Sequence, residues 1–241
     1  MIRYLISLIA LILLVQTDLV FPESFDAKII YAKGNIELFS KRTNKILHEH
    51  KEIKKKGLRS GDTIKIGKKS LAILSITNSL GTAKVKLVEN TSFSVSQFTK
   101  NKPIIGKLNS GASFVKFVRS TIQEKKTHKT PLIIKASRIS MGVRGTEFFA
   151  SFSQSKVKGE TDVWMCVNEG NVLTFNKKTK QHATVPAGQG VRIKNGQKIT
   201  DVREYEWTKK LNWNMDAKKG SVVNEVDIKR AYYDLLETDY D

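Results

Sequence analysis

Apolar and polar residues alternate with a period of two along much of the central chain. Val85 and Leu87 alternate with lysines, and the same alternation recurs over 92–96, 163–167 and 191–194. Residues two apart lie on the same face of an extended strand, so each of these segments presents one apolar face and one polar face. The pattern predicts half-buried β-strands.

These segments are separated by glycines, each followed within a few residues by a polar and then an apolar residue. The glycines are Gly34, Gly61, Gly111 and Gly170. Their spacing is irregular, so they do not form a clean sequence repeat. Coils of unequal length, each turning at a glycine and returning an apolar strand to a shared core, would produce such a series. We therefore predict an all-β domain over 25–200, with a β-solenoid-like or rolled β fold.

The N-terminal segment has a different character. Arg3 is followed by an apolar run from Leu5 to Val15, which is too short to span a bilayer comfortably. We interpret residues 1–24 as a secretory signal peptide, with an uncleaved anchor as the alternative. The run is not followed directly by a cysteine, which argues against a lipoprotein anchor, and Cys166 is expected to be a buried small hydrophobe.

Residues 201–241 are richer in helix formers. Aromatic residues stand among charged ones over 201–213, and Asn224 is a candidate N-cap for a segment with apolar residues on one helical face. We expect two short amphipathic helices, joined by a loop at 218–221, as a C-terminal extension. They would pack on the β domain or dock on a partner.

The formal net charge is +19, and removal of residues 1–24 would take away Arg3, Asp18 and Glu23 and leave about +20. Such a positive field attracts polyanions, which for an exported protein are anionic lipid, acidic glycan or extracellular DNA. A merely solubilising face is the alternative. The candidate basic patch comprises Lys41, Arg42, Lys45, Lys54, Lys55, Lys56, Arg59, Lys68 and Lys69.

The sequence gives little support to other classes of chemistry. It contains no nucleophile elbow, phosphate-binding glycine loop or zinc-protease motif, and basic residues are not interleaved with aromatics as in nucleic-acid readers. His48 and His50 have no cysteine at ligand spacing. We expect no catalytic residues, no metal and no cofactor, with a glycan-active carboxylate pair as a minor alternative.

One run places two glycines and a lone arginine between apolar segments. The two glycines permit backbone conformations or close approaches that other residues do not, and arginine carries a rigid fork of five donors. We predict a tight turn, with Glu147 or Glu169 satisfying the arginine or the turn amides. The residues are Gly142, Val143, Arg144, Gly145, Thr146, Glu147 and Phe148.

This run resembles the signature of the FecR-type domain. Other landmarks of that family occur in the expected order over roughly residues 30–195, and their ordered set is more specific than any one of them. They are Leu58–Ile64, Ser70–Leu74, Leu87–Phe93, Leu108–Gly111, Val167–Val172 and Val185–Val191.

The resemblance implies a non-enzymatic protein of the bacterial periplasm or cell envelope that acts as a protein-binding, scaffold or signal-sensing module. FecR-type proteins commonly carry a cytoplasmic anti-sigma segment ahead of a membrane span. Because an export signal stands first in this chain, we expect only the periplasmic half of that arrangement. Binding to an unidentified envelope protein is expected to use sheet edges or the face near Gly142–Phe148, and polyanion binding by the basic patch is the alternative function.

Overall fold

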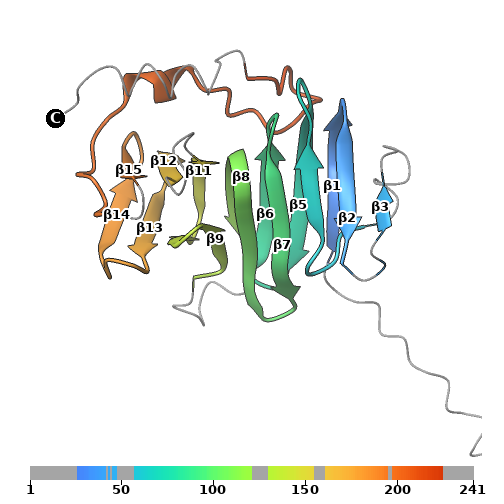
Figure 1. Cartoon of the computed structure of the whole chain (residues 1–241), viewed down its shortest axis with the longest axis horizontal. Coiled ribbons are helices and arrows are strands. Elements are labelled where there is room, and N and C mark those ends of the chain that lie inside the picture. The colour runs from blue at the N-terminus through green and yellow to red at the C-terminus, as the bar shows by residue number, and fades with distance from the viewer. Residues whose placement is uncertain are drawn as a thin grey trace, which may run out of the picture.

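The computed structural model describes residues 26–41, 43, 45–47, 57–120, 130–154, 161–194 and 197–224. Within these residues the chain is almost entirely β, and its strands form one large, open, 15-stranded sheet (Figure 1). The all-β prediction is confirmed. No helix in the described part of the chain has the length and apolar character needed to cross a membrane.

The sheet folds over into two layers that share the long strand β8 (Lys102–Arg119). Layer A contains β1 (Asp26–Lys33), β5 (Leu71–Asn78), β6 (Gly81–Leu87), the second half of β8, β11 (Thr146–Gln154), β12 (Thr161–Glu169) and β15 (Gly190–Lys194). Layer B contains β14 (His182–Pro186), β13 (Asn171–Asn176), β10 (Ile139–Val143), β9 (Leu132–Ala136), the first half of β8, β7 (Ser92–Thr99), β4 (Thr63–Ile66), β2 (Ile36–Ser40) and β3 (Lys45–Leu47).

Strand β8 passes from one layer to the other at Gly111, whose φ is +85°. A Cβ atom at this position would lie 2.5 Å from the Cα atom of Thr91, so only glycine fits. The Thr91 hydroxyl donates to the Ala112 carbonyl and accepts from the Ala112 amide, both at 3.0 Å. These bonds fix the corner of the folded sheet.

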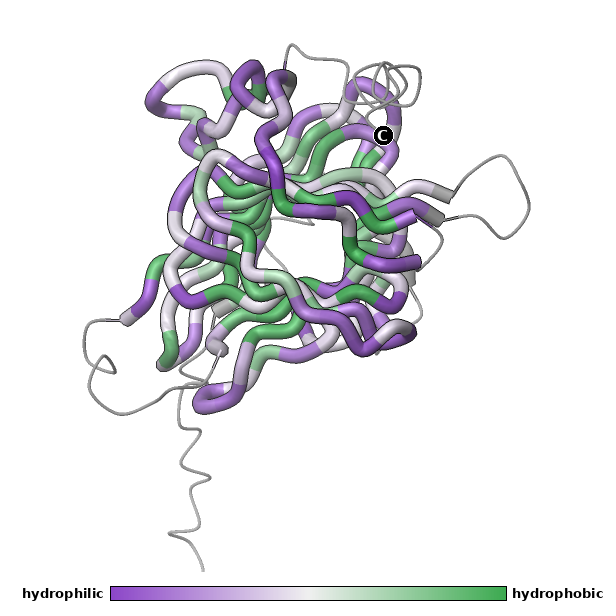
Figure 2. Tube along the Cα trace, turned by 90° about the vertical axis from the view of Figure 1, so that its left-hand side faces the viewer, coloured by the Kyte–Doolittle hydropathy of each residue, from purple (hydrophilic) through white to green (hydrophobic). Residues whose placement is uncertain are grey.

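The main core lies between the layers, where apolar residues from both of them form one cluster. Figure 2 shows hydrophobic segments lining the inside of the folded sheet. Leu74 and Val85 of layer A and Ile64 and Phe93 of layer B are fully buried. The period-two pattern therefore reflects strands that turn alternate residues into this core.

The solenoid-like expectation is wrong. Among the described strands, pairing is antiparallel everywhere except between β8 and β9. Neighbouring strands such as β5 and β6 are joined by tight turns that send the chain straight back, whereas the coils of a solenoid stack their strands in parallel.

The expected helix over 201–213 is also wrong, because this segment contains only a 3₁₀ turn, η2 (Glu206–Lys210). Residues 203–222, which we call the strap, instead lie across the outer face of layer A, and they are the red segment at the top of Figure 1. Where the strap passes over β15, Arg203 forms a β-bridge with Gly190. Where it passes over β12, the ring of Tyr205 packs on Trp164. The segment expected to be capped by Asn224 lies outside the described residues.

The strap follows one row of cross-strand neighbours on layer A. The row consists of Tyr31, Ile73, Lys86, Phe114, Phe149, Cys166 and Gly190, each the registered partner of the next. Trp213 packs edge-to-face on Phe114 at 5.3 Å between ring centroids, and Val222 packs against Ile73. The strap thus covers an apolar stripe that would otherwise face solvent.

Candidate functional site

The Gly142–Phe148 run forms a crossing from layer B to layer A. Gly142 and Val143 end β10, Arg144 and Gly145 form the turn, and Thr146 begins β11. Val143, Thr146 and Phe148 are buried, whereas Arg144 and Gly145 are exposed. The chain bends at Arg144 and Gly145, and the arginine is exposed.

The turn packs closely against a second turn, at Gly170. Gly170 has a φ of +78°, and a Cβ atom there would lie 2.4 Å from the Gly145 carbonyl oxygen. The Thr146 hydroxyl donates to the carbonyl of Asn171 at 3.0 Å. This close approach requires glycine at 170 and holds the two turns together as one rim.

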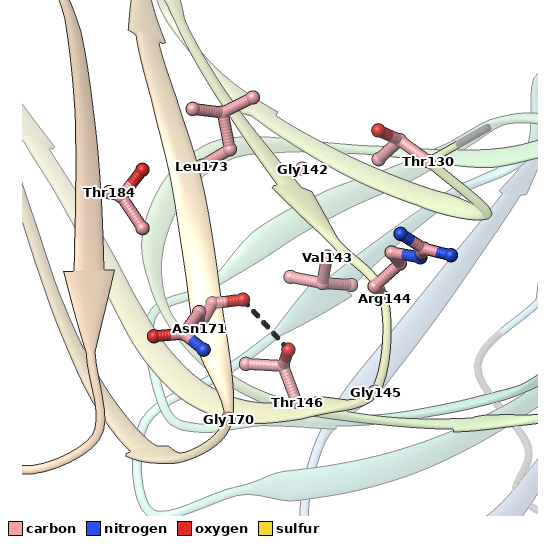
Figure 3. A pocket seen from close by; sticks show the side chains of 10 residues that line it. All are labelled: Thr130, Gly142, Val143, Arg144, Gly145, Thr146, Gly170, Asn171, Leu173 and Thr184. Carbon is pink, nitrogen blue, oxygen red and sulfur yellow. Dashed lines mark hydrogen bonds between the residues drawn. The ribbon is translucent and has the colours of Figure 1, made fainter. Parts of the chain in front are cut away.

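Beside this rim, the outer face of layer B is hollowed by a shallow cavity of about 360 Å³ (Figure 3). Gly142 lies in a row of cross-strand neighbours between Ile133 and Leu173, so the row lacks a side chain at its middle position. Leu173 is 48% exposed at the wall of the cavity. The lining residues are Thr130, Gly142, Val143, Arg144, Gly145, Thr146, Gly170, Asn171, Leu173 and Thr184.

Arg144 forms no ion pair or side-chain hydrogen bond with any described residue. The expected pairing with Glu147 or Glu169 is therefore not present in the described part of the chain. Both glutamates pair instead with Lys116, whose Nζ atom lies 3.6 Å from Oε2 of Glu147 and 3.4 Å from Oε2 of Glu169.

Strand register explains this difference. Glu147 is the cross-strand neighbour of Lys116 on the outer face of layer A. The Glu147 carboxylate is buried and also accepts a 2.8 Å hydrogen bond from the Asn168 amide. A second, smaller hollow of about 220 Å³ lies here, lined in part by Lys116 and Glu169, and it shares Gly145 and Thr146 with the first. The turn is thus a ridge between two hollows.

The predicted basic patch is described only in part. Arg42, Lys54, Lys55 and Lys56 lie outside the described residues, and Lys45 is described only as a backbone position in β3. The structure places Lys41, Arg59, Lys68 and Lys69 at exposed positions.

Two of these residues are brought together by the buried carboxylate of Asp62. Asp62 accepts hydrogen bonds from the backbone amides of Lys41, at 3.3 Å, and Arg59, at 3.0 Å. Lys68 and Lys69 belong instead to the turn after β4, where the Lys69 amide donates to Glu89 at 2.7 Å. The described members of the patch therefore lie on two separate turns.

Lys86 is a charged residue whose burial the sequence did not indicate. Its side chain is fully buried beneath the strap and donates to the carbonyls of Asn212 and Asn214, the latter at 3.0 Å. Burial lowers the pKa of Lys86 to about 8, against a smaller opposing effect of the Glu147 charge. The alternation of apolar and polar residues predicts that this lysine points away from the core. It does not predict that a later segment of the chain covers this face.

The described residues contain no group of three or more histidine, cysteine or acidic side chains placed to hold a metal ion. Cys166 is buried beneath the strap, and burial raises the pKa of its thiol far above the ordinary value. This thiol is therefore not poised as a nucleophile.

No family model matches the sequence, and a search of curated proteins found no match. Among solved structures, two crystal structures described as a "putative anti-sigma factor" from Parabacteroides distasonis ATCC 8503 are similar to this chain. They have TM-scores of 0.43 and 0.38, each with 14% identity, over 59% and 56% of this chain. This chain spans 59% and 60% of their lengths, less than two thirds in both cases.

Proposed function

We propose that this protein is a non-enzymatic, FecR-type module of the bacterial cell envelope that binds another protein through the hollowed face of layer B. The order of the FecR-like motifs supports the family, and the apolar N-terminal run supports export. One observation carries the binding role: Arg144 is exposed at the rim of the hollow and has no ion-pair partner among the described residues.

The two outer faces of the sheet differ in a way that favours layer B as the binding face. The apolar stripe of layer A is occupied by the strap. On layer B, Leu173 remains 48% exposed in the wall of the hollow. An exposed leucine next to a guanidinium that is unpaired among the described residues offers an apolar contact and a bidentate site for a carboxylate.

The hollow also lies close to a sheet edge. Among the described strands, β14 is at the end of layer B and pairs with β13 alone, and its Thr184 lines the hollow. An extended partner segment could therefore pair with the outer edge of β14 while its side chains reach Leu173 and Arg144. The partner expected from this chemistry is a peptide segment with an acidic side chain next to an apolar one.

Site-specific photo-crosslinking in native envelope extract tests this proposal. A photoreactive amino acid at Leu173 is expected to give a discrete protein adduct that persists at high salt, and Arg144→Ala is expected to remove it. The same probe at Val118, which is 59% exposed on layer A, is the control and should not give that adduct. Adducts at Leu173 that are unchanged by Arg144→Ala, or no adduct at all, would contradict the proposal.

A further inference from the structure

Five exposed cations gather at one end of layer B, on three segments that are distant in sequence. Arg138 lies in the turn between β9 and β10, and three lysines lie in the turn between β13 and β14. Lys198 follows β15. We call this group the turn cluster, and its members are Arg138, Lys177, Lys178, Lys180 and Lys198.

Hydrogen bonds hold the three segments together. The amide of Lys177 donates to the carbonyl of Arg138 at 3.0 Å, which joins the two turns. The fully buried Asn176 accepts from the amide of Lys178 at 3.0 Å and donates to the carbonyl of Gln197 at 2.6 Å. A buried asparagine that links two charged loops fixes the position of their cations before any ligand arrives.

Gln181 completes this arrangement from the other side of the turn. Its side-chain oxygen accepts from the amide of Ile199 at 3.0 Å, and its carbonyl accepts from the amide of Asn176 at 2.9 Å. Lys198 is therefore held between two anchored neighbours, Gln197 and Ile199. The backbone positions of the turn cluster are fixed, while its charged ends remain in solvent.

The turn cluster is not neutralised within the described part of the protein. None of its five side chains forms an ion pair with a described carboxylate, and the acidic residue nearest in sequence is the exposed Asp201. Like charges kept close together without counter-charges repel one another, so an anion would be bound favourably here.

The shape of this end indicates which kind of anion fits. Four of the five residues stand in turns between strands, Lys198 lies in the segment after β15, and none of them lines either of the two hollows described above, so their charges are carried on loops. Phe175, next to the β13–β14 turn, is stacked on His182 at 4.7 Å, so it is already engaged within the protein. Cations carried on loops, with no free aromatic ring offered at Phe175, match a flat anionic surface better than a nucleic-acid strand, which needs aromatic stacking platforms.

We infer that the turn cluster is a docking site for anionic lipid headgroups at a membrane surface. This site is distinct from the hollow around Arg144 and does not depend on the protein-binding role proposed for it. Each lysine near an anionic bilayer strengthens binding by about fivefold. Removal of two of them should therefore weaken binding by about 25-fold to 30-fold.

Vesicle flotation of the full chain tests this inference. The probes are vesicles of phosphatidylcholine alone and vesicles with about a third phosphatidylglycerol at low and high salt. The apolar run from Leu5 to Val15 is common to all variants, and its contribution is measured with phosphatidylcholine alone. Lys177→Gln with Lys178→Gln should abolish most of the binding that depends on phosphatidylglycerol.

The matched control is Lys100→Gln with Lys102→Gln. These exposed lysines lie near the start of β8, and because β8 and β9 are parallel, they are at the opposite end of layer B from Arg138. The control should bind like the unmodified protein. An equal loss in both variants, no dependence on phosphatidylglycerol, or tighter binding to a DNA duplex than to the vesicles would each overturn the inference.

Discussion

The ammonium group of Lys86 lies 4.1 Å from the centre of the Phe114 ring, beneath the strap. Both residues belong to the cross-strand row that the strap follows, and both are fully buried. The aromatic face and the carbonyls of Asn212 and Asn214 take the place of water around the charge. Lys86 thus attaches the C-terminal segment to the sheet by polar contacts within an apolar stripe.

Lys86→Met should loosen the strap while leaving the main core folded. Methionine keeps an apolar stem of similar length, but it cannot donate to the two strap carbonyls. Loss of two hydrogen bonds should raise the rate of chymotrypsin cleavage after Tyr205 and Trp213 by about tenfold. The control is Lys84→Met, two residues away on the same face, where cleavage should be unchanged. Equal rates in both variants would contradict the role of Lys86.

The lowered pKa of Lys86 predicts how stability depends on pH. In the unfolded chain this lysine loses its proton near the ordinary pKa of about 10.5, whereas in the folded protein it does so at about 8. Between these values the unfolded state binds more protons, so the free energy of unfolding should rise with pH, by at most about 1.4 kcal/mol per unit from this group. Below pH 8 the contribution to the slope disappears.

Urea unfolding from pH 7 to pH 10.5 measures this effect. At each pH, the free energy of unfolding of Lys86→Met is subtracted from that of the unmodified protein. The difference removes the contributions of the other titrating lysines and tyrosines. The difference in the free energy of unfolding should be constant below pH 8. Above pH 8, the unmodified protein should gain stability relative to Lys86→Met as the pH rises. A difference that is constant over the whole range would show that Lys86 is solvated in the folded state.

Gly170→Ala tests the packing of the two turns at the hollow. The new Cβ atom would meet the Gly145 carbonyl at 2.4 Å, in addition to the cost of a positive φ. Gly188→Ala is a matched control, because Gly188 has a similar φ of +82° but open space around its Cβ position. We expect a loss of about 1 kcal/mol at 188 and about 3 kcal/mol or more at 170, measured by thermal unfolding. Equal losses would mean that the turns separate easily.

Glu147 and Glu169 share Lys116 but should differ in their effect on stability. Glu147→Gln alters a buried carboxylate that also accepts from Asn168, and it should cost about 1–3 kcal/mol. The Glu169 side chain is 66% exposed, so Glu169→Gln should change the free energy of unfolding by less than about 0.5 kcal/mol. Urea unfolding at neutral pH compares them, and a reversed order would contradict the described geometry.

The β character and the bend at Arg144 could be predicted because both depend on short-range pattern. Period two places alternate residues on opposite faces, and two glycines within four residues favour a turn. The partner of Glu147 could not be predicted, since Lys116 lies 31 residues earlier and meets it only through the register of β8 and β11. The alternation itself contains no information on which strands become neighbours.

The strap was missed for a related reason. Its aromatic and apolar residues, among them Tyr205, Leu211 and Trp213, stand among charged residues, a pattern that predicts a short amphipathic helix. The same residues contact layer A in a mostly extended chain, because the stripe below them is a line of side chains across several strands. Contact with a long, straight stripe outweighs the weak helix propensity of a short segment.

Arg144→Ala should leave stability unchanged and remove partner binding. The sequence predicts a carboxylate partner for this arginine, but the exposed guanidinium has no ion pair or side-chain hydrogen bond with a described residue. We therefore expect the melting temperature to stay within about 2 °C, because surface changes usually alter stability by less than about 0.5 kcal/mol. An arginine at the centre of an interface contributes about 2 kcal/mol or more, so binding should weaken by at least about 30-fold.

Arg138→Ala is the matched control for that experiment, since Arg138 is also exposed and also lacks an ion pair with a described residue. It stands in the turn cluster rather than at the hollow, so protein adducts at Leu173 should persist in this variant. A lower melting temperature in Arg144→Ala would restore a structural role for the arginine. Loss of adducts in both variants would instead mean that general positive charge attracts the partner, because Arg138 does not line the hollow.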